Sequence, residues 1–184
     1  KLTEDFANFI GVWLGDGHIR HDNQKGIIRG IGLTVDSKNQ ELLKFVKSVA
    51  ADVFGCNIVQ SKNKNCINVY INSTLVGTVF QEIFGSYFDG KKLPNMIFSW
   101  PKNMVESLLA GIITSDGHVT KQKCNVTIGL SNEHLMTQLY HLCRINGYAV
   151  SFVRGLRQGG MTCDPFSMSV SVTEKIVTQI RKYY

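Results

Sequence analysis

The chain has 184 residues, a formal net charge of +6 and a hydrophobic content of 43%. This apolar content excludes a disordered chain, and no stretch approaches the roughly 18–20 uncharged apolar residues that a membrane-spanning helix requires. The basic charge, with a sequence pI near 9.1, permits a polyanionic partner such as nucleic acid but does not establish one.

Helical periodicity recurs in six segments, and alternating or β-branched runs occupy four of the intervals between them. In chain order these are a helix over 3–15, strands within 17–35, a helix over 37–54, strands within 56–71, helices over 73–84 and 103–115, strands within 117–131, a helix over 132–146, strands within 147–165 and a helix over 173–183.

The element boundaries carry signals of their own. Two helix starts have the spacing of a capping box, Ser37 with Gln40 and Asn103 with Glu106. Hairpin turns are predicted where glycine or asparagine gathers between the β-type runs. These positions are Gly26, residues 63–65 and residues 159–160.

The second half of the chain repeats the first. Residues 9–19 (FIGVWLGDGHI) and 109–119 (LAGIITSDGHV) align without a gap at an offset of 100. The elements that follow match in order, so each half is an αββαββα unit. The sequence therefore predicts an α+β protein with two pseudo-twofold-related halves, 1–85 and 103–184, and a linker over 86–102.

The repeated helices carry small residues at every fourth position. A ridge of small residues lets two helix backbones approach closely. A glycine inside a helix is up to about 1 kcal/mol less favourable than alanine, so these glycines require a packing reason. We expect the two repeated helices to pair at the interface through Ala7, Gly11 and Gly15 on one and Ser107, Gly111 and Ser115 on the other.

Asp16 and Asp116 directly follow the two ridges, and each precedes a glycine that can end a helix with a positive φ. Paired helices would place the two carboxylates close together, where two helix C-termini add partial negative charge. Such an arrangement is repulsive unless a cation intervenes, and Mg²⁺ suits hard oxygen ligands. A single Asp-Gly is more often a plain turn, but two at matched helix ends favour a metal site.

The excess positive charge falls on the predicted strands and hairpins. These regions hold nine basic and two acidic residues, a net +7, and the rest of the chain carries −1. One interpretation is protection of sheet edges, and the other is a basic sheet face laid along a nucleic-acid duplex. The nine basic residues are Arg20, Lys25, Arg29, Lys62, Lys64, Lys121, Lys123, Arg154 and Arg157.

The motifs at 9–17 and 109–117 resemble those of the LAGLIDADG homing endonucleases, of the single-chain type with two motifs. The likeness extends over essentially the whole chain. The earlier acidic position of the motif is Leu14 in one copy and Thr114 in the other, whereas both copies keep the last acid. Residues 89–94 (DGKKLP) are similar to the Lys-x-x-Pro stretch before the second motif in intein endonucleases, including the yeast vacuolar-ATPase intein type.

The resemblance implies a saddle of two antiparallel sheets on double-stranded DNA. It also implies metal-dependent cleavage of both strands at a long recognition site, which leaves short 3′ overhangs. The expected form is a monomer with internal pseudo-dimer symmetry. The basic strand residues, with His18 and His118, would contact phosphates and base edges.

The resemblance also implies the site residues. Asp16 and Asp116, with the preceding Gly15 and Ser115, would form the metal site for Mg²⁺. We expect Mn²⁺ to substitute and Ca²⁺ to bind without supporting cleavage. Lys91 would be the catalytic lysine; the adjacent lysine at 92 is the alternative, and a solvated loop lysine is the interpretation without a function.

One symmetry is incomplete, because Lys91 lies 75 residues after Asp16 and its counterpart would fall near position 191. Either a longer chain supplies it, or a residue such as Lys182 replaces it. A chain extended beyond Tyr184 would then cut the second strand faster. His18 and His118, which follow each Asp-Gly, could act as acid or base, although plain phosphate contacts are favoured.

Other features bound the function. Five cysteines without Cys-x-x-Cys spacing, and no signal-peptide core, favour a reducing intracellular setting: the nucleus in a eukaryote, an organelle or the cytoplasm otherwise. The termini lack the residues that protein splicing requires, so an endonuclease part alone or a free-standing relative is expected. The main competing function is a non-cleaving nucleic-acid binder, maturase-like or regulatory, and a hydrolase of small phosphoesters is a poor third.

Overall fold

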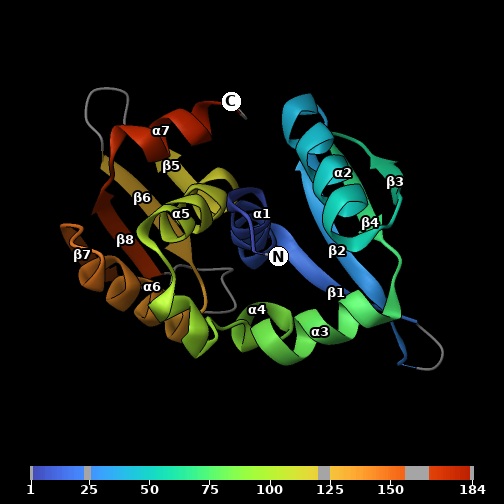
Figure 1. The fold of residues 1–184 in the computed structure, drawn as a ribbon, viewed down its shortest axis with the longest axis horizontal. Helices are drawn as coiled ribbons and strands as arrows, with labels where there is room; N and C mark the ends of the chain where they lie inside the picture. Colours follow the sequence, from blue (N-terminus) through green and yellow to red (C-terminus); the bar gives the residue numbers. More distant parts are fainter. Residues whose placement is uncertain (1, 23–25, 120–124, 156–165, 183–184) are drawn as a thin grey trace.

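The computed structural model describes residues 2–22, 26–119, 125–155 and 166–182. The predicted αββαββα order is confirmed in both halves, which lie on either side of a central helix pair (Figure 1). The first half contains α1 (Glu4–Asp16), β1 (Gly17–His21), β2 (Ile28–Asp36), α2 (Gln40–Phe54), β3 (Ile58–Asn63), β4 (Cys66–Ile71) and α3 (Thr74–Phe84). The second contains α5 (Lys102–Asp116), β5 (Gly117–Val119), β6 (Asn125–Leu130), α6 (Glu133–Ile145), β7 (Val150–Arg154), β8 (Phe166–Ser171) and α7 (Glu174–Arg181).

Each half folds around one four-stranded antiparallel sheet. The strand orders are β1-β2-β4-β3 and β5-β6-β8-β7, so the two sheets have the same topology. Their registers also match at the motif, where Gly17 pairs with Leu33 and Gly117 pairs with Ile128. This agreement supports the internal duplication that the sequence predicts.

One strand prediction is wrong in position. The last β region was expected within 147–165, whereas β8 runs over 166–171, beyond that range. Its alternate residues Phe166, Met168 and Val170 are buried against the helices, which is the period-2 pattern of a half-buried strand. The turns at 26 and 63–65 are confirmed, with φ of +63° at Gly26 and +46° at Lys64; the turn at 159–160 lies outside the described residues.

Both predicted capping boxes are also wrong. The N-cap of α2 is Asn39, whose side chain accepts a hydrogen bond from Leu42 N at 3.1 Å, whereas Gln40 donates to the Ser37 carbonyl. Helix α5 starts after Pro101 and has no side-chain cap. Asn103 and Glu106 instead contact other elements of the fold, so their spacing reflects tertiary contacts rather than capping.

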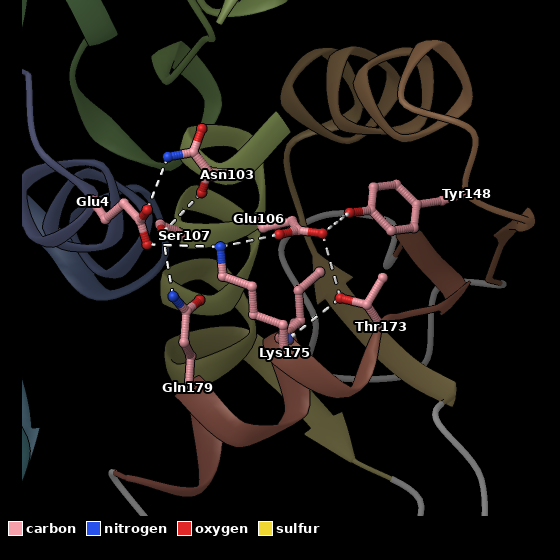
Figure 2. A network of polar contacts seen from close by, with 9 residues as sticks. Glu4, Asn103, Glu106, Ser107, Tyr148, Thr173, Lys175 and Gln179 are labelled. Atoms are coloured by element: carbon pink, nitrogen blue, oxygen red, sulfur yellow. Dashed lines mark hydrogen bonds and ion pairs between the residues drawn. The ribbon is translucent and has the colours of Figure 1, made fainter. Parts of the chain in front are cut away.

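These contacts form a polar network at the N-terminal ends of α1 and α5 (Figure 2). Asn103 donates to Glu4 Oε1 of α1 at 2.8 Å. The buried Glu106 carboxylate accepts from Tyr148 at 3.2 Å and lies 3.4 Å from Lys175 Nζ of α7. The network therefore ties α1, α5 and α7 together at the end of the helix pair that is remote from the motif aspartates.

Helices α1 and α5 lie side by side between the two sheets, as the small-residue ridges predicted (Figure 1). A methyl group at Gly11 would overlap the Leu108 carbonyl oxygen, and one at Gly111 would overlap the Asn8 carbonyl oxygen. The two backbones are thus close enough that only glycine fits at the crossing.

The linker is more ordered than a plain connection. It contains the short helix α4 (Tyr87–Gly90) and the 3-10 helix η1 (Asn95–Ser99). Leu93 and Ile97 are buried in the common core, which anchors the linker between the halves. Across the described residues, no helix is long and apolar enough to cross a lipid bilayer.

Candidate active site

Each motif helix passes directly into a strand. Helix α1 ends at Asp16 and β1 begins at Gly17, and the same junction joins α5 to β5. The expected positive φ is wrong, because Gly17 and Gly117 are extended at φ of −85° and −103°. Packing explains these glycines instead: a methyl group would overlap the Trp13 ring at Gly17, and would lie 2.5 Å from Ile113 Cγ2 at Gly117.

The close helix pairing brings the two motif carboxylates together. A methyl group at Gly15 would lie 2.5 Å from Asp116 Oδ2, so the Asp116 carboxylate rests against the residue that precedes Asp16. The aspartates therefore meet at the C-terminal end of the helix pair, where the helix dipoles disfavour negative charge.

The electrostatics of this pair favour a cation. Desolvation raises the pKa of Asp16 from 3.8 to about 6; repulsion from Asp116 adds to the rise, and attraction to Lys91 opposes it. Desolvation also raises the pKa of Asp116, again against the pull of Lys91. Two partly desolvated carboxylates at two helix ends are destabilised when both ionise, and a divalent cation would relieve that repulsion.

Lys91 lies at the end of α1 and is only 6% exposed, so it is not a solvated loop lysine. Its Nζ donates to the Trp13, Leu14 and Gly15 carbonyls at 3.2, 2.8 and 2.9 Å. All three ammonium donors thus satisfy carbonyls in the last turn of α1. Burial lowers the pKa of Lys91 to about 8, with Asp116 and Asp16 opposing the shift; the adjacent Lys92 is exposed.

Two side chains of the second half hold the backbone of this lysine segment, and sequence reasoning missed both. Asn132 Nδ2, on a buried residue, donates to the Lys91 carbonyl at 2.8 Å. Gln138 accepts from Leu93 N at 2.7 Å and donates to the Leu93 carbonyl at 2.9 Å. The only sequence signal was the position of Asn132 at the start of a predicted helix, which indicates an N-cap and not a contact with the linker.

The proposed metal donors are hard oxygens. Among the described residues, no group of three or more His, Cys, Asp or Glu side chains could hold a metal ion. A cation here would depend on the two aspartates, backbone carbonyls and water, a donor set that suits Mg²⁺. The Gly15 carbonyl already accepts from Lys91, and the Ser115 hydroxyl donates to the Ile112 carbonyl at 3.0 Å, so Ser115 offers its own carbonyl rather than its side chain.

The two histidines differ in their surroundings. The His18 ring lies against Gly32 of β2 and meets the Tyr70 ring edge-on, with ring centroids 6.3 Å apart. Burial lowers the pKa of His18, and the positive charges of Lys91 and Arg20 lower it further. His118 is exposed opposite Thr127. A neutral His18 is suited to a hydrogen bond rather than to an ion pair with a phosphate.

The strand registers divide the predicted basic residues between two faces. Residues directly opposite each other on neighbouring strands point to the same face. Arg20 shares the open face with His18, stacks 4.7 Å from the Tyr70 ring centroid and donates to Asn72. Lys62 instead pairs with Ile67, on the face that the helices cover.

The remaining basic residues are dispersed. Arg154 pairs with Phe166 on the helix-covered side and lies 5.5 Å over that ring. Arg29 forms an ion pair with Asp22 at 2.6 Å, and Lys64 occupies the β3–β4 turn. The structure therefore does not gather these residues on one surface with Arg20. Lys25, Lys121, Lys123 and Arg157 lie outside the described residues.

The open faces carry mostly small, uncharged polar side chains, which sequence reasoning did not single out. Several are hydrogen-bonded across strands, such as Thr34 with Asn68 at 3.2 Å and Ser171 with Asn125 at 2.8 Å. Such groups can donate to and accept from base edges in a major groove. By register, the others include Tyr70, Thr127, Ser151, Ser167 and Ser169.

Comparison with known proteins places this geometry in a family. A sequence model of the LAGLIDADG DNA endonuclease family matches residues 7–146. A DNA polymerase of Thermococcus hydrothermalis is 27% identical over 88% of this chain, and a DNA polymerase of Thermococcus litoralis is 27% identical over 84%. The chain spans only 9% of the length of either polymerase.

Solved structures agree with the fold. A mesophilic variant of the homing endonuclease I-DmoI has a TM-score of 0.69 at 12% identity, covering 98% of this chain and 94% of that one. I-DmoI bound to DNA and Mn has a TM-score of 0.68 at 12% identity, with 98% and 96% covered. The N-terminal LAGLIDADG domain of DUF199/WhiA has a TM-score of 0.52 at 14% identity, with 98% and 82% covered.

Proposed function

Since the chain belongs to the LAGLIDADG DNA endonuclease family, we propose that it is a site-specific homing endonuclease that cuts both strands of a long DNA target and leaves 3′ overhangs. The observation that carries this proposal is the meeting of Asp16 and Asp116 at the ends of the paired helices, next to the buried Lys91. Structures of I-DmoI with target DNA and Mn, Ca or Mg support a divalent metal in this site.

The residues of the chain divide the task. Asp16 and Asp116, with the carbonyls of Gly15 and Ser115, would hold Mg²⁺, which when bound would activate water and stabilise the departing 3′ oxygen. Mn²⁺ would substitute, and Ca²⁺ would bind without cleavage. Lys91 places a positive charge at the end of α1, where it opposes the charge of both carboxylates and would stabilise negative charge on the phosphate.

The open sheet faces would bind the duplex and position its phosphates. Arg20 supplies charge beside the site, and the small polar side chains of β2, β4, β6 and β8 would contact base edges. His18, whose pKa is lowered by burial, would hydrogen-bond a phosphate oxygen or a base as a neutral ring. Because β1 begins at the residue after Asp16, DNA binding and cleavage would be coupled through one continuous segment.

A plasmid library with randomised inserts tests the function. We expect wild-type protein with Mg²⁺ or Mn²⁺ to linearise a subset of plasmids, whose sequenced ends share one long site and a 3′ overhang. Asp16→Asn and Asp116→Asn should each lower the cleavage rate about 100-fold or more while they retain binding. Asp52→Asn, which makes the same charge change on the exposed surface of α2, is the matched control and should cleave normally.

Binding to enriched sites without cleavage by any of these metals would instead identify a non-cleaving DNA binder. Equal cleavage by wild-type protein and both motif variants would place the active site elsewhere.

A further inference from the structure

The segment 91–93 fills a groove between the end of α1 and the start of α6. Asn132 of α6 holds the Lys91 carbonyl, and the Lys91 ammonium holds the Leu14 and Gly15 carbonyls of α1. The segment leaves α3 directly, because Lys92 N donates to the Phe84 carbonyl at 2.8 Å. An extended peptide with one lysine thus joins the two halves on this side.

The internal duplication defines an equivalent groove on the other side. Exchanging the halves replaces α1 by α5 and α6 by α2. Asn39 then takes the place of Asn132, since each is an N-cap whose side chain accepts from the backbone nitrogen three residues ahead. The end of α5, with Thr114 and Ser115, takes the place of the end of α1.

This equivalent groove is open. A cavity of about 630 Å³ lies there, and its lining includes Asp16, Thr34, Asn39, Thr114, Ser115 and Lys182. Within the described part of the chain, no hydrogen bond is made by Asn39 Nδ2, the atom that corresponds to the one holding the Lys91 carbonyl. The groove therefore keeps the side-chain amide, the helix end and the adjacent aspartate of its counterpart, but no peptide segment from the described residues.

We propose that this groove is a docking site for an extended peptide segment that carries a lysine, seated as residues 91–93 are seated opposite. Its backbone carbonyl would accept from Asn39, and its ammonium would donate to the last carbonyls of α5 beside Asp16. The polypeptide that continues from α7 is the occupant with the shortest route, because Lys182 at the end of α7 lines the groove. Docking there is independent of the cleavage activity proposed above.

One difference from the counterpart limits the expected affinity. Gln138, which makes two hydrogen bonds to Leu93, lies six residues after Asn132; the residue six positions after Asn39 is Phe45. The open groove thus lacks one of the two backbone clamps, and we expect docking to require a tether rather than to occur from free solution.

A grafted tail tests the proposal in the full chain, without DNA or metal. A copy of residues 85–95 (GSYFDGKKLPN) joined directly after Tyr184 places its first lysine at the same spacing from α7 as Lys91 has from α3. We expect backbone amides of residues 34–42 to exchange hydrogen about tenfold more slowly than in the chain without the tail. A tail in which both lysines are replaced by alanine should give no such protection.

Asn39→Asp separates specific docking from nonspecific contact. Aspartate still accepts from Leu42 N and caps α2, but it has no donor for the tail, so protection should fall about five- to tenfold. Asn132→Asp, the same change in the filled groove, should leave protection by the tail intact.

The proposal is wrong if the lysine tail does not slow exchange at 34–42, or if the alanine tail protects these amides equally. It is also wrong if duplex DNA protects them and the tail does not, since the groove would then belong to nucleic acid. Because the readout involves no cleavage, an inactive protein with a protected groove would refute only the proposed function.

Discussion

At the scale of single residues, the site is governed by charges that the fold brings together and partly desolvates. Two carboxylates share the end of a helix pair with one buried ammonium, and the three groups shift one another's pKa. Lys91 also satisfies helix carbonyls that would otherwise add to the negative potential. The metal-free protein is thus destabilised at the site where the metal is proposed to bind.

This strain predicts a pH-dependent gain on removing one charge. The pKa of Asp16 is raised to about 6 on folding, so the folded chain holds a proton that the unfolded chain releases between about pH 4 and 6, and its stability falls as pH rises through that window. In the metal-free protein, Asp16→Asn should raise Tm by about 2–4 °C at pH 7.5, the shift for about 1 kcal/mol in a chain of this size after solvent screening. At pH 4 the gain should vanish.

Differential scanning calorimetry at the two pH values measures this difference. Asp52→Asn, on the exposed surface of α2, should change Tm equally little at both. A gain that is the same at pH 4 and pH 7.5 would show that the two carboxylates do not repel each other in the folded protein.

At the scale of elements, the helix pair determines the architecture, because its backbones approach without intervening side chains. Gly11 and Gly111 face each other's partner carbonyls, and Ser115 lies against Gly15. The close approach aligns the two helix ends, and so it also places the two aspartates. Packing at the ridges and the geometry of the site are therefore a single feature of the fold.

Gly11→Ala tests the helix pair. In an isolated helix this change would be favourable by up to about 1 kcal/mol, but here the methyl group would overlap the Leu108 carbonyl oxygen. We expect the free energy of unfolding to fall by about 3 kcal/mol, as overpacking dominates. Urea denaturation provides the measurement, with Gly129→Ala, where a methyl group meets no atom within 4 Å, as the control.

The sequence was sufficient for the elements whose cause is local or repeated. Small residues at every fourth position predicted the helix pair, and the repeated Asp-Gly predicted adjacent carboxylates. The contacts of Asn103 and Glu106 could not be predicted, because their partners lie on α1, α7 and the strand region near Tyr148. The faces of Lys62 and Arg154 depend on strand register, which long-range pairing fixes.

At the scale of the whole molecule, charge and recognition separate onto different surfaces. The open sheet faces are mainly uncharged and polar, and some of the basic side chains lie on the helix-covered sides. Net charge alone therefore overstates the number of phosphate contacts that the described strands can make. Arg20, beside the motif helix and on the open face, is the described arginine best placed to make one.

Salt dependence of DNA binding distinguishes the two surfaces. Arg20→Gln should weaken binding and reduce the slope of log K against log salt by about 1, since one phosphate contact is lost. Lys62→Gln removes the same charge from the opposite face and should leave the slope unchanged. Fluorescence anisotropy on a target recovered from the cleavage selection gives both values, and equal slopes for the two variants would contradict the assignment of faces.

The direct passage from α1 into β1, and from α5 into β5, has a consequence for how such a protein acquires new targets. A loop at these junctions would let a recognition strand shift its register while the carboxylate stayed in place. No such slack exists, because Gly17 and Gly117 are both the end of a helix and the start of a strand. Heritable changes of specificity should therefore accumulate on the inner and edge strands β2, β4, β6 and β8 and be rare on β1 and β5, where any displacement would also move a carboxylate.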